Sequence, residues 1–504
     1  LAKTITIATG LSMSSITTNI KIGVGGAYSI ISKSLGLEAG GSIGIPFYIS
    51  QALSAALYIA GFTAGWLLLF PTHSAIVVSL SAWAVLLSIS YISTIFAIRI
   101  QYIIMVIIAG SLVSIYLAPP EFASSIQLLG NFEDAGFWEV FAVFFPAVTG
   151  IMAGANLSGD LANPRKAIPQ GTLSAILITM IIYISLAFML SIIASPEALR
   201  SNEMILVEKA SWGFIVTMGI LAATFSSALG GMIGAPRILE ALAISHTIPF
   251  SGFFSTKSKD GEPRNAIIFT GLFIVIPLTL GDFNALATLI TMFFLITYGT
   301  LNLVVFIQQS MKIISFRPTF KVPRFVSFIG FIGSIFIMFL INPVFSFIAI
   351  LTIVGIYIYL TRQGLDAKFG YIRGGMFLAI AEKASHIANK FPKHQVVWKP
   401  DILLPVEDPE EWAGPLLFIR NITYPSGSIF AFSVKDSELE QSHDALKELL
   451  HPISNKDVLI NSTVIEEHDF IHGAKIVIQT LRGGSFRPNT LFLTIGEDPR
   501  KDDN

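Results

Sequence analysis

The segment 144–156 combines the polar groups and backbone properties most suited to binding a small ion. Its sequence, Phe-Phe-Pro-Ala-Val-Thr-Gly-Ile-Met-Ala-Gly-Ala-Asn, places one proline and two glycines inside an apolar run long enough to cross a bilayer. Proline and glycine both weaken helices, so we expect a break here. A break frees carbonyl oxygens, which suit cations, and amides at the start of the next half-helix, which suit anions. Because lipid satisfies neither group, the pattern predicts an ion or substrate site inside a transporter.

Further polar residues lie inside other apolar segments. Tyr58 lies midway along one segment, Ser226 and Ser227 are adjacent in a second, and Tyr298 lies in a third. Taken singly, each fits helix packing or interface anchoring better than ligand binding. Their coexistence with the broken segment favours a shared ion-binding role.

Charged side chains are nearly absent from the middle of the apolar segments. Proton-coupled carriers usually keep a carboxylate or histidine at membrane depth, because a group must titrate there. Here the polar groups are hydroxyls, amides and backbone groups. Neutral oxygens hold monovalent cations, and backbone amides with tyrosine hydroxyls hold chloride. The sequence therefore favours inorganic ions without a proton relay.

Composition excludes several other classes of protein. The chain is 53% hydrophobic and 13% charged, about half the ~25% charge of an ordinary soluble domain. Its net charge of −1 does not suggest nucleic acid as a partner. The glycine-rich segment 23–27 lacks the lysine of a phosphate-binding loop and indicates a tight turn instead. Without a nucleophile–base pair, a metal cluster or a nucleotide motif, we expect neither an enzyme nor a resident cofactor.

Apolar runs near the ~20 residues needed to cross a bilayer recur to about residue 361. The predicted spans are 2–19, 45–69, 74–97, 101–118, 137–158, 169–194, 212–233, 265–281, 284–308, 325–342 and 344–361. Lysine and arginine concentrate on alternate connections, which places the C-terminal tail in the cytoplasm. The first span then runs from outside to inside, so a cytoplasmic N-terminus would require one more span ahead of it.

The composition after about residue 370 is that of a soluble domain. Residues 371–391 read as an amphipathic helix, and strand-like runs then alternate with helical patterns, which predicts a largely parallel α/β sheet. The strand-like runs are 402–406, 416–422, 428–434, 457–465 and 490–495, and the helical patterns are 437–450 and 470–482. The predicted domains are a transporter domain (1–362), a connecting helix and linker (363–396) and a cytoplasmic α/β regulatory domain (397–504).

Read together, these residues resemble the cation–chloride cotransporters of the amino acid–polyamine–organocation superfamily. The motif at 145–160, Phe-Pro-Ala-Val-Thr-Gly-Ile-Met-Ala-Gly-Ala-Asn-Leu-Ser-Gly-Asp, is close to that family's most characteristic one. Further similar segments are 17–19, 25–36, 234–237, 316–318, 398–400 and 487–491. The resemblance implies an α-helical membrane bundle with LeuT-like inverted repeats and broken helices. We expect eleven of the family's twelve spans here, with the first, also a broken helix, absent.

The resemblance also implies ion ligands, carried over where residue types match. Potassium would be held by Tyr58, the carbonyl of Pro146 and the hydroxyl of Thr149. Chloride would be held by the amides of Gly150 and Ile151 and the hydroxyl of Tyr298. Sodium, in the sodium-coupled members, would be held by the carbonyl of Ala223 and the hydroxyls of Ser226 and Ser227.

The expected function is electroneutral symport of chloride with potassium and, because the serine pair is present, sodium, by alternating access. The alternatives are potassium–chloride symport without sodium, an amino acid or polyamine carrier on the same fold, and a non-transporting regulatory subunit if the first span is truly absent. The expected partners are the inorganic ions, the bilayer of the plasma membrane and a second copy of the chain. The resemblance implies that the cytoplasmic tail carries the dimer contacts and regulation.

Overall fold

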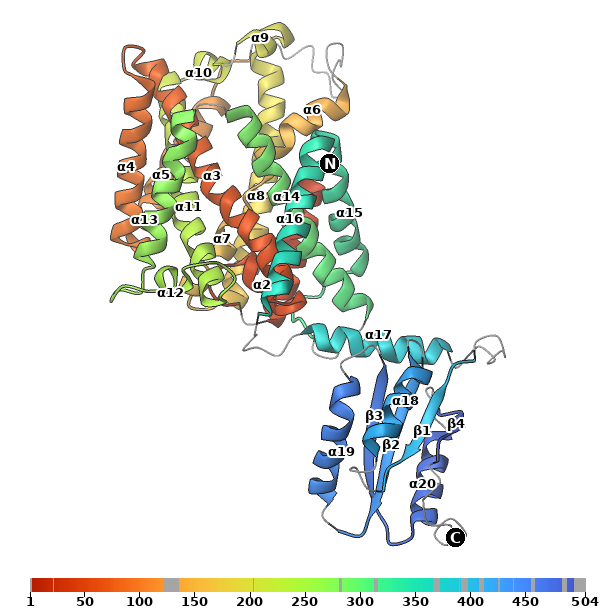
Figure 1. Ribbon diagram of the computed structural model, residues 1–504. Helices are drawn as coiled ribbons and strands as arrows, with labels where there is room; N and C mark the ends of the chain where they lie inside the picture. The colour runs from red at the N-terminus through yellow and green to blue at the C-terminus, as the bar shows by residue number, and fades with distance from the viewer. Residues whose placement is uncertain are drawn as a thin grey trace. The chain divides into compact units, whose positions relative to one another are not determined.

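The structure is a computed structural model that describes residues 2–20, 22–120, 136–202, 204–280, 283–311, 316–365, 372–388, 390, 398–407, 412–424, 427–437, 439–454, 458–482 and 487–493. The chain forms two compact units, Leu1–Ala379 and Ile380–Asn504. The first unit is a bundle of helices that run side by side, and the second contains a small sheet (Figure 1).

Among the described residues, nine helical segments are long and apolar enough to cross a membrane. They are α3 (Leu37–Leu69), α4 (Ala75–Ile92), α5 (Thr94–Tyr116), the interrupted segment Phe137–Asp160, α8 (Pro164–Ile193), α11 (Gly213–Ile244), most of α14 (Phe283–Ser310), α15 (Arg324–Ile341) and α16 (Pro343–Gln363). With the shorter apolar α13 (Arg264–Leu280) and the more polar α1 (Ala2–Asn19), a helix lies at each of the eleven predicted segments. That all eleven cross a membrane stays a prediction.

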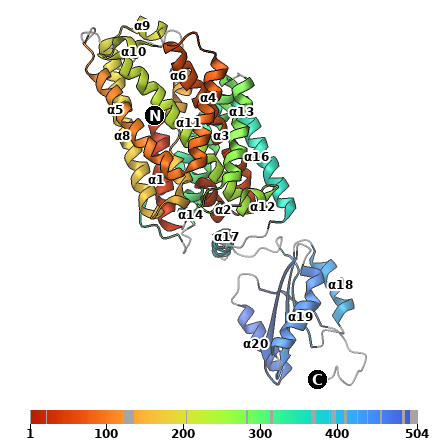
Figure 2. The same ribbon diagram turned by 90° about the vertical axis from the view of Figure 1, so that its left-hand side faces the viewer.

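Helix α1 is rich in serine and threonine, yet most of its residues are buried against α8, α14 and α15 (Figure 2). Most of its hydroxyls are paired, either within the helix or with Asn302, although the buried hydroxyl of Ser15 has no partner among the described residues. Thr9 donates to the carbonyl of Ile5 at 2.9 Å, within the helix. Ser12 donates to Oδ1 of Asn302 at 2.7 Å, and Nδ2 of Asn302 donates to Oγ1 of Thr9 at 2.8 Å. Burial of a polar helix is tolerated because these groups satisfy one another.

Small residues let the central helices approach closely. A Cβ added at Gly231 of α11 would lie 2.9 Å from Cβ of Ala55 on α3, so no larger residue fits there. Four short helices connect the long ones: α2 (Ala27–Leu35), α9 (Pro196–Ser201), α10 (Ile205–Lys209) and α12 (Ser251–Phe254). Gly25 and Gly26 have φ of +93° and +50° in the turn that leads into α2, which confirms a turn, as predicted, at these glycines.

The second unit contains α17 (Ile372–Ala388) in part and a parallel sheet in the order β3-β2-β1-β4. The strands are β1 (Asp401–Pro405), β2 (Ser428–Lys435), β3 (Leu459–Glu466) and β4 (Thr490–Leu491), and the helices between them are α18 (Ala413–Thr423), α19 (Leu439–Ser454) and α20 (Phe470–Arg482). Figure 2 shows α18 and α19 on one face of the sheet and α20 on the other. The predicted parallel α/β layer is confirmed.

One predicted strand is wrong. The apolar run 416–422 lies in helix α18, where Leu416 and Ile419 are buried and Leu417, Phe418 and Ile422 are exposed. A short apolar run cannot be assigned to helix or strand by periodicity alone, because both bury apolar residues. The buried positions at i and i+3 are those of a helix resting on the sheet.

We expect Gly330→Ala to lower the free energy of unfolding of the helical unit by about 1–3 kcal/mol, because the new methyl group would overlap the buried amide of Asn302. Thermal unfolding in detergent measures the effect. The control is Gly355→Ala on α16, where an added Cβ meets nothing within 4 Å. Equal unfolding temperatures for the two variants would contradict the packing described here.

Candidate functional site

The predicted break in the segment 144–156 is confirmed. Helix α6 (Phe137–Phe144) passes into the 3-10 turn η1 (Phe145–Val148), and the backbone then leaves helical geometry before α7 (Ala153–Asn156) and the 3-10 turn η2 (Ser158–Asp160). At the break, Thr149 is extended and Gly150 has φ of +95°, a conformation that favours glycine. The sequence at 146–150 therefore causes the interruption directly.

The break brings together the two oxygens expected to bind potassium. Oγ1 of Thr149 lies 2.7 Å from the carbonyl oxygen of Pro146 and donates a hydrogen bond to it. The amide of Thr149 donates to the same carbonyl at 3.2 Å. Two neutral oxygens on one turn of backbone are groups of the kind that can contribute to the coordination of a monovalent cation.

Amide donors converge on one buried phenol on the other side of the break. The Gly150 amide donates to the hydroxyl oxygen of Tyr298 at 3.0 Å, and the Ile151 amide faces the same oxygen. Tyr298, on α14, is fully buried. Two amides that point at one oxygen form the arrangement that binds an anion at a helix N-terminus.

Two more tyrosines approach this region. Tyr58, on α3, is half-buried and lies near Tyr298 and Tyr183. The hydroxyl of Tyr183, on α8, donates to the carbonyl of Ala147 at 3.0 Å. Tyr183 was not predicted as a site residue, although a tyrosine inside an apolar helix is the same signal that identified Tyr58 and Tyr298.

A cavity of about 420 Å³ borders the break and is lined mainly by η1, α7 and α8. Thr149, Gly150, Ile151 and Tyr183 line it, and Lys3 is the one charged side chain among the described residues of its lining. The ammonium of Lys3 donates to Oγ1 of Thr179 at 2.8 Å and lies 4.8 Å from the centre of the Tyr183 ring. Lys3 was not predicted as a site residue either, because this lysine lies near the start of α1 rather than in the middle of an apolar segment.

The serine pair lies on α11. Ser226 is half-buried and Ser227 is exposed, and neither hydroxyl has a hydrogen-bond partner among the described residues. Ala223 lies one turn earlier on the same helix. The structure brings Gly150 and Tyr298 together next to Thr149, whereas no hydrogen bond among the described residues joins the serine pair to that group.

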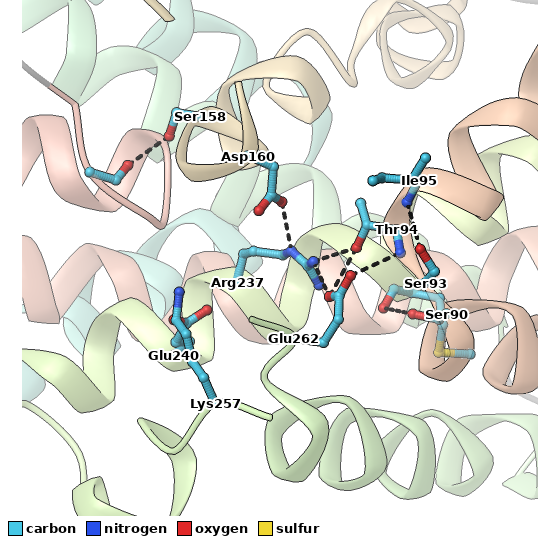
Figure 3. A network of polar contacts seen from close by, with 12 residues as sticks. Ser90, Ser93, Thr94, Ile95, Ser158, Asp160, Arg237, Glu240, Lys257 and Glu262 are labelled. Carbon is cyan, nitrogen blue, oxygen red and sulfur yellow. Dashed lines mark hydrogen bonds and ion pairs between the residues drawn. The ribbon is translucent and has the colours of Figure 1, made fainter. Parts of the chain in front are cut away.

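A second polar cluster surrounds Arg237 of α11 (Figure 3). The guanidinium pairs with Asp160 and Glu262, and Lys257 pairs with Glu240 at 2.8 Å. Burial alone would raise the pKa of the Glu262 carboxyl, but hydrogen bonds from Thr94 and the charge of Arg237 outweigh it, so this pKa lies below its ordinary value. The ionised Glu262 carboxylate therefore stabilises the folded state at pH values above the ordinary pKa of a glutamate. This stabilisation is lost as the pH falls through the lowered pKa of Glu262.

Comparison with protein families agrees with this architecture. Residues 1–384 match the family model described as amino acid permease, and residues 404–504 match the first part of the C-terminal domain of prokaryotic cation-chloride cotransporters. The permease match covers well over half of the chain, so the chain belongs to the amino acid permease family. The predicted fold class, a helical membrane bundle of this superfamily with a domain containing strands, is therefore confirmed.

Individual proteins similar to this chain include members of solute carrier family 12. Solute carrier family 12 member 2 of Mus musculus is 29% identical over 99% of this chain and 47% of its own length. Member 1 of the same organism is 27% identical over 99% of this chain and 52% of its own length. Member 9 of Danio rerio is 28% identical over 82% of this chain and 52% of its own length. The chain thus spans about half the length of the curated relatives that it matches. The resemblance to cation–chloride cotransporters, and the assignment to a family of integral membrane transporters, are confirmed.

We expect Tyr298→Phe to lower the free energy of unfolding by about 1–3 kcal/mol, because the Gly150 amide loses its buried acceptor. Thermal unfolding of the purified protein measures this loss. The control is Tyr357→Phe on the exposed side of α16, which should leave the unfolding temperature unchanged. A stable Tyr298→Phe variant would show that the amide has another acceptor.

Proposed function

We propose that the protein is a secondary active transporter that moves chloride together with potassium and sodium by alternating access. The observation that carries the proposal is the break between η1 and α7. On one side, the Pro146 carbonyl and the Thr149 hydroxyl lie 2.7 Å apart, and on the other, two amides face the Tyr298 hydroxyl. One interruption therefore supplies oxygens for a cation and donors for an anion.

In this proposal, potassium binds at the carbonyl of Pro146, the hydroxyl of Thr149 and the phenol of Tyr58. The Thr149 hydroxyl now donates to the Pro146 carbonyl, so binding requires the hydroxyl proton to turn away and expose both oxygens. Tyr58 approaches from α3, a different helix, so the cation would link the broken segment to the bundle. Such a link is one way for ion binding to favour one conformation over another.

Chloride in this proposal binds at the Gly150 and Ile151 amides and the Tyr298 hydroxyl. The phenol oxygen now accepts from the Gly150 amide, and rotation of the phenol would let its O–H group join the amides as a third donor. The ammonium of Lys3 in the lining of the adjacent cavity adds positive potential that attracts an anion. The charge and the donor groups therefore favour the same class of ligand.

Sodium would bind at the carbonyl of Ala223 and the hydroxyls of Ser226 and Ser227. The hydroxyls are free of partners within the described residues, which leaves their oxygens available as ligands. Bound cations and anions stabilise one another strongly at low dielectric, so each ion would raise the affinity for the others. This coupling makes the transport obligatory without a resident cofactor or a source of chemical energy.

The proposal also covers the membrane in which the protein lies and its assembly with a second copy. We place the protein in the plasma membrane with its α/β unit on the cytoplasmic side, as the distribution of lysine and arginine predicts. We also propose that it works as a homodimer in which the α/β unit contributes contacts and regulation. We further propose that the chain consists of a transporter domain (1–362), a connecting helix and linker (363–396) and a cytoplasmic α/β regulatory domain (397–504).

A carrier of amino acids or other carboxylates is a second candidate. The match to amino acid permeases and the cationic lining of a cavity of about 420 Å³ favour it, because an ammonium group can pair with a substrate carboxylate. Such a carrier would not require chloride.

Rubidium-tracer uptake by the full-length protein in proteoliposomes, with chloride and sodium removed in turn, separates these functions. Loss of rubidium uptake both when chloride is removed and when sodium is removed supports the proposal. Loss of uptake only when chloride is removed indicates potassium–chloride symport. Uptake that is indifferent to chloride would reject the proposal in favour of the carboxylate carrier. Absence of uptake under every condition would support a non-transporting regulatory subunit.

We expect Thr149→Ala to raise the KM for rubidium about tenfold, because one of the proposed cation ligands is lost. Rubidium uptake measured over a concentration series gives this value. Thr149→Ser keeps the hydroxyl and is the matched control, with a KM near that of the wild type. An unchanged KM in the alanine variant would count against the potassium site.

We expect the double substitution Ser226→Ala, Ser227→Gly to abolish the sodium dependence of rubidium uptake while chloride dependence remains. The reason is that both proposed hydroxyl ligands disappear. Uptake with sodium replaced by an organic cation measures the effect. Ser88→Ala, on the exposed side of α4, is the control. Retained sodium dependence in the double variant would remove the serine pair from the mechanism.

A further inference from the structure

Arg237 joins elements that are far apart in the sequence. Its side chain is almost completely buried on α11 and donates to Thr94 at the start of α5, to Glu262 before α13, and to Asp160 at the end of η2 (Figure 3). Asp160 belongs to the broken segment, whereas Thr94 begins α5 and Glu262 lies just before α13, two helices that pack against α11. Arg237 therefore connects the broken segment to the rest of the bundle.

The two carboxylates that Arg237 binds are held very differently. Glu262 is buried and also accepts from the amide of Thr94 at 2.9 Å and from its hydroxyl at 3.0 Å. The Asp160 side chain is 43% exposed and meets the guanidinium through a single contact of 3.2 Å from Nε. Of the two ion pairs, Arg237–Asp160 is the one that water can replace.

Charge balance points to the same conclusion. One guanidinium is already neutralised by the buried carboxylate of Glu262, so the attraction left for Asp160 is smaller and is screened by solvent. Release of Asp160 leaves Arg237 paired and places the freed carboxylate in water. Loss of Glu262, by contrast, would leave an uncompensated buried charge, which is strongly unfavourable.

Within the described part of the chain, few other polar contacts hold the second half of the broken helix in place. Asn156 of α7 is fully buried next to Gly234 of α11, yet neither polar atom of its amide has a partner in the described part of the chain. Ser158 donates to the carbonyl of Gly23 at 2.7 Å, in the turn before α2. The Arg237–Asp160 pair is therefore a principal polar link from this half-helix to α11.

We propose that Arg237 is a positioning residue for transport: it holds Asp160, and through it the half-helix α7 that follows Thr149 and Gly150, against α11. The Arg237–Asp160 pair opens when this half-helix moves, while Arg237–Glu262 stays closed and keeps Arg237 in place. This inference rests on the proposed function for its role in transport, but the contact itself can be tested without any transport measurement.

A cysteine reporter tests the position of the half-helix directly. The 504 residues contain no cysteine, and a side chain at Gly154 of α7 would enter open space beside the cavity. In the full-length protein with other cysteines removed, we expect Asp160→Asn to raise the rate at which a charged thiol reagent modifies Gly154→Cys by about fivefold or more. Fluorescence size-exclusion chromatography checks that each variant is folded.

Two further variants separate positioning from general damage. Arg237→Lys keeps the charge that balances Glu262 but replaces the fork that reaches two carboxylates with a single ammonium, so its modification rate should rise as in Asp160→Asn. The modification rate of the double variant should not rise further, because both substitutions remove the same contact between residues 237 and 160. The control is Asp260→Asn, which removes an exposed ion pair with Arg264 of the same 3.2 Å length and should leave the rate unchanged.

Two results would overturn the inference: a modification rate in Asp160→Asn equal to that of Asp260→Asn, or additive effects of Asp160→Asn and Arg237→Lys. The transport measurement is read separately. If wild-type rubidium uptake proves independent of chloride, the proposed function fails, and the modification rates still decide whether Arg237 holds the half-helix. If uptake is chloride-dependent, Asp160→Asn should change its maximal rate about fivefold or more and leave the KM values for the ions near wild type.

Discussion

An interrupted helix inside an apolar bundle must find partners for the backbone groups that it frees, and the first unit of this protein is arranged around that constraint. The carbonyl of Pro146 is satisfied by Thr149, and the amide of Gly150 is satisfied by Tyr298 from a different helix. Each partner is itself a polar group that an ion can replace or join. The interruption is therefore stable without a ligand and remains suited to bind one.

The same constraint explains why the surrounding helices carry unusual residues. Helix α1 buries hydroxyls that pair with Asn302, and α8 and α14 each direct a tyrosine hydroxyl to the break. Arg237 extends this pattern to the far end of the broken segment, where one buried ion pair is fixed and the other is open to water. A half-helix held by replaceable contacts at both ends can move as a unit, as the proposed alternating access would require.

Membership of the amino acid permease family and similarity to solute carrier family 12 agree with this arrangement. Cotransport without a titratable group at the break depends on mutual attraction between bound ions. Neutral oxygens for cations and amides for anions, only a few residues apart, provide the close spacing that such attraction needs. Lys3 adds one positive charge to the lining of the adjacent cavity.

The sequence by itself determined the positions of the long helices, the break at 146–150 and the parallel α/β unit, because length, hydrophobicity and the conformational limits of proline and glycine are local properties. It misassigned 416–422, since a short apolar run suits a strand and a helix equally. Only the tertiary structure decided that Tyr298 would meet Gly150, that Lys3 and Tyr183 would line the cavity, and that Arg237 would join Asp160 to Glu262. These contacts link residues 25 to 180 positions apart, and their geometry depends on how helices pack rather than on any local pattern.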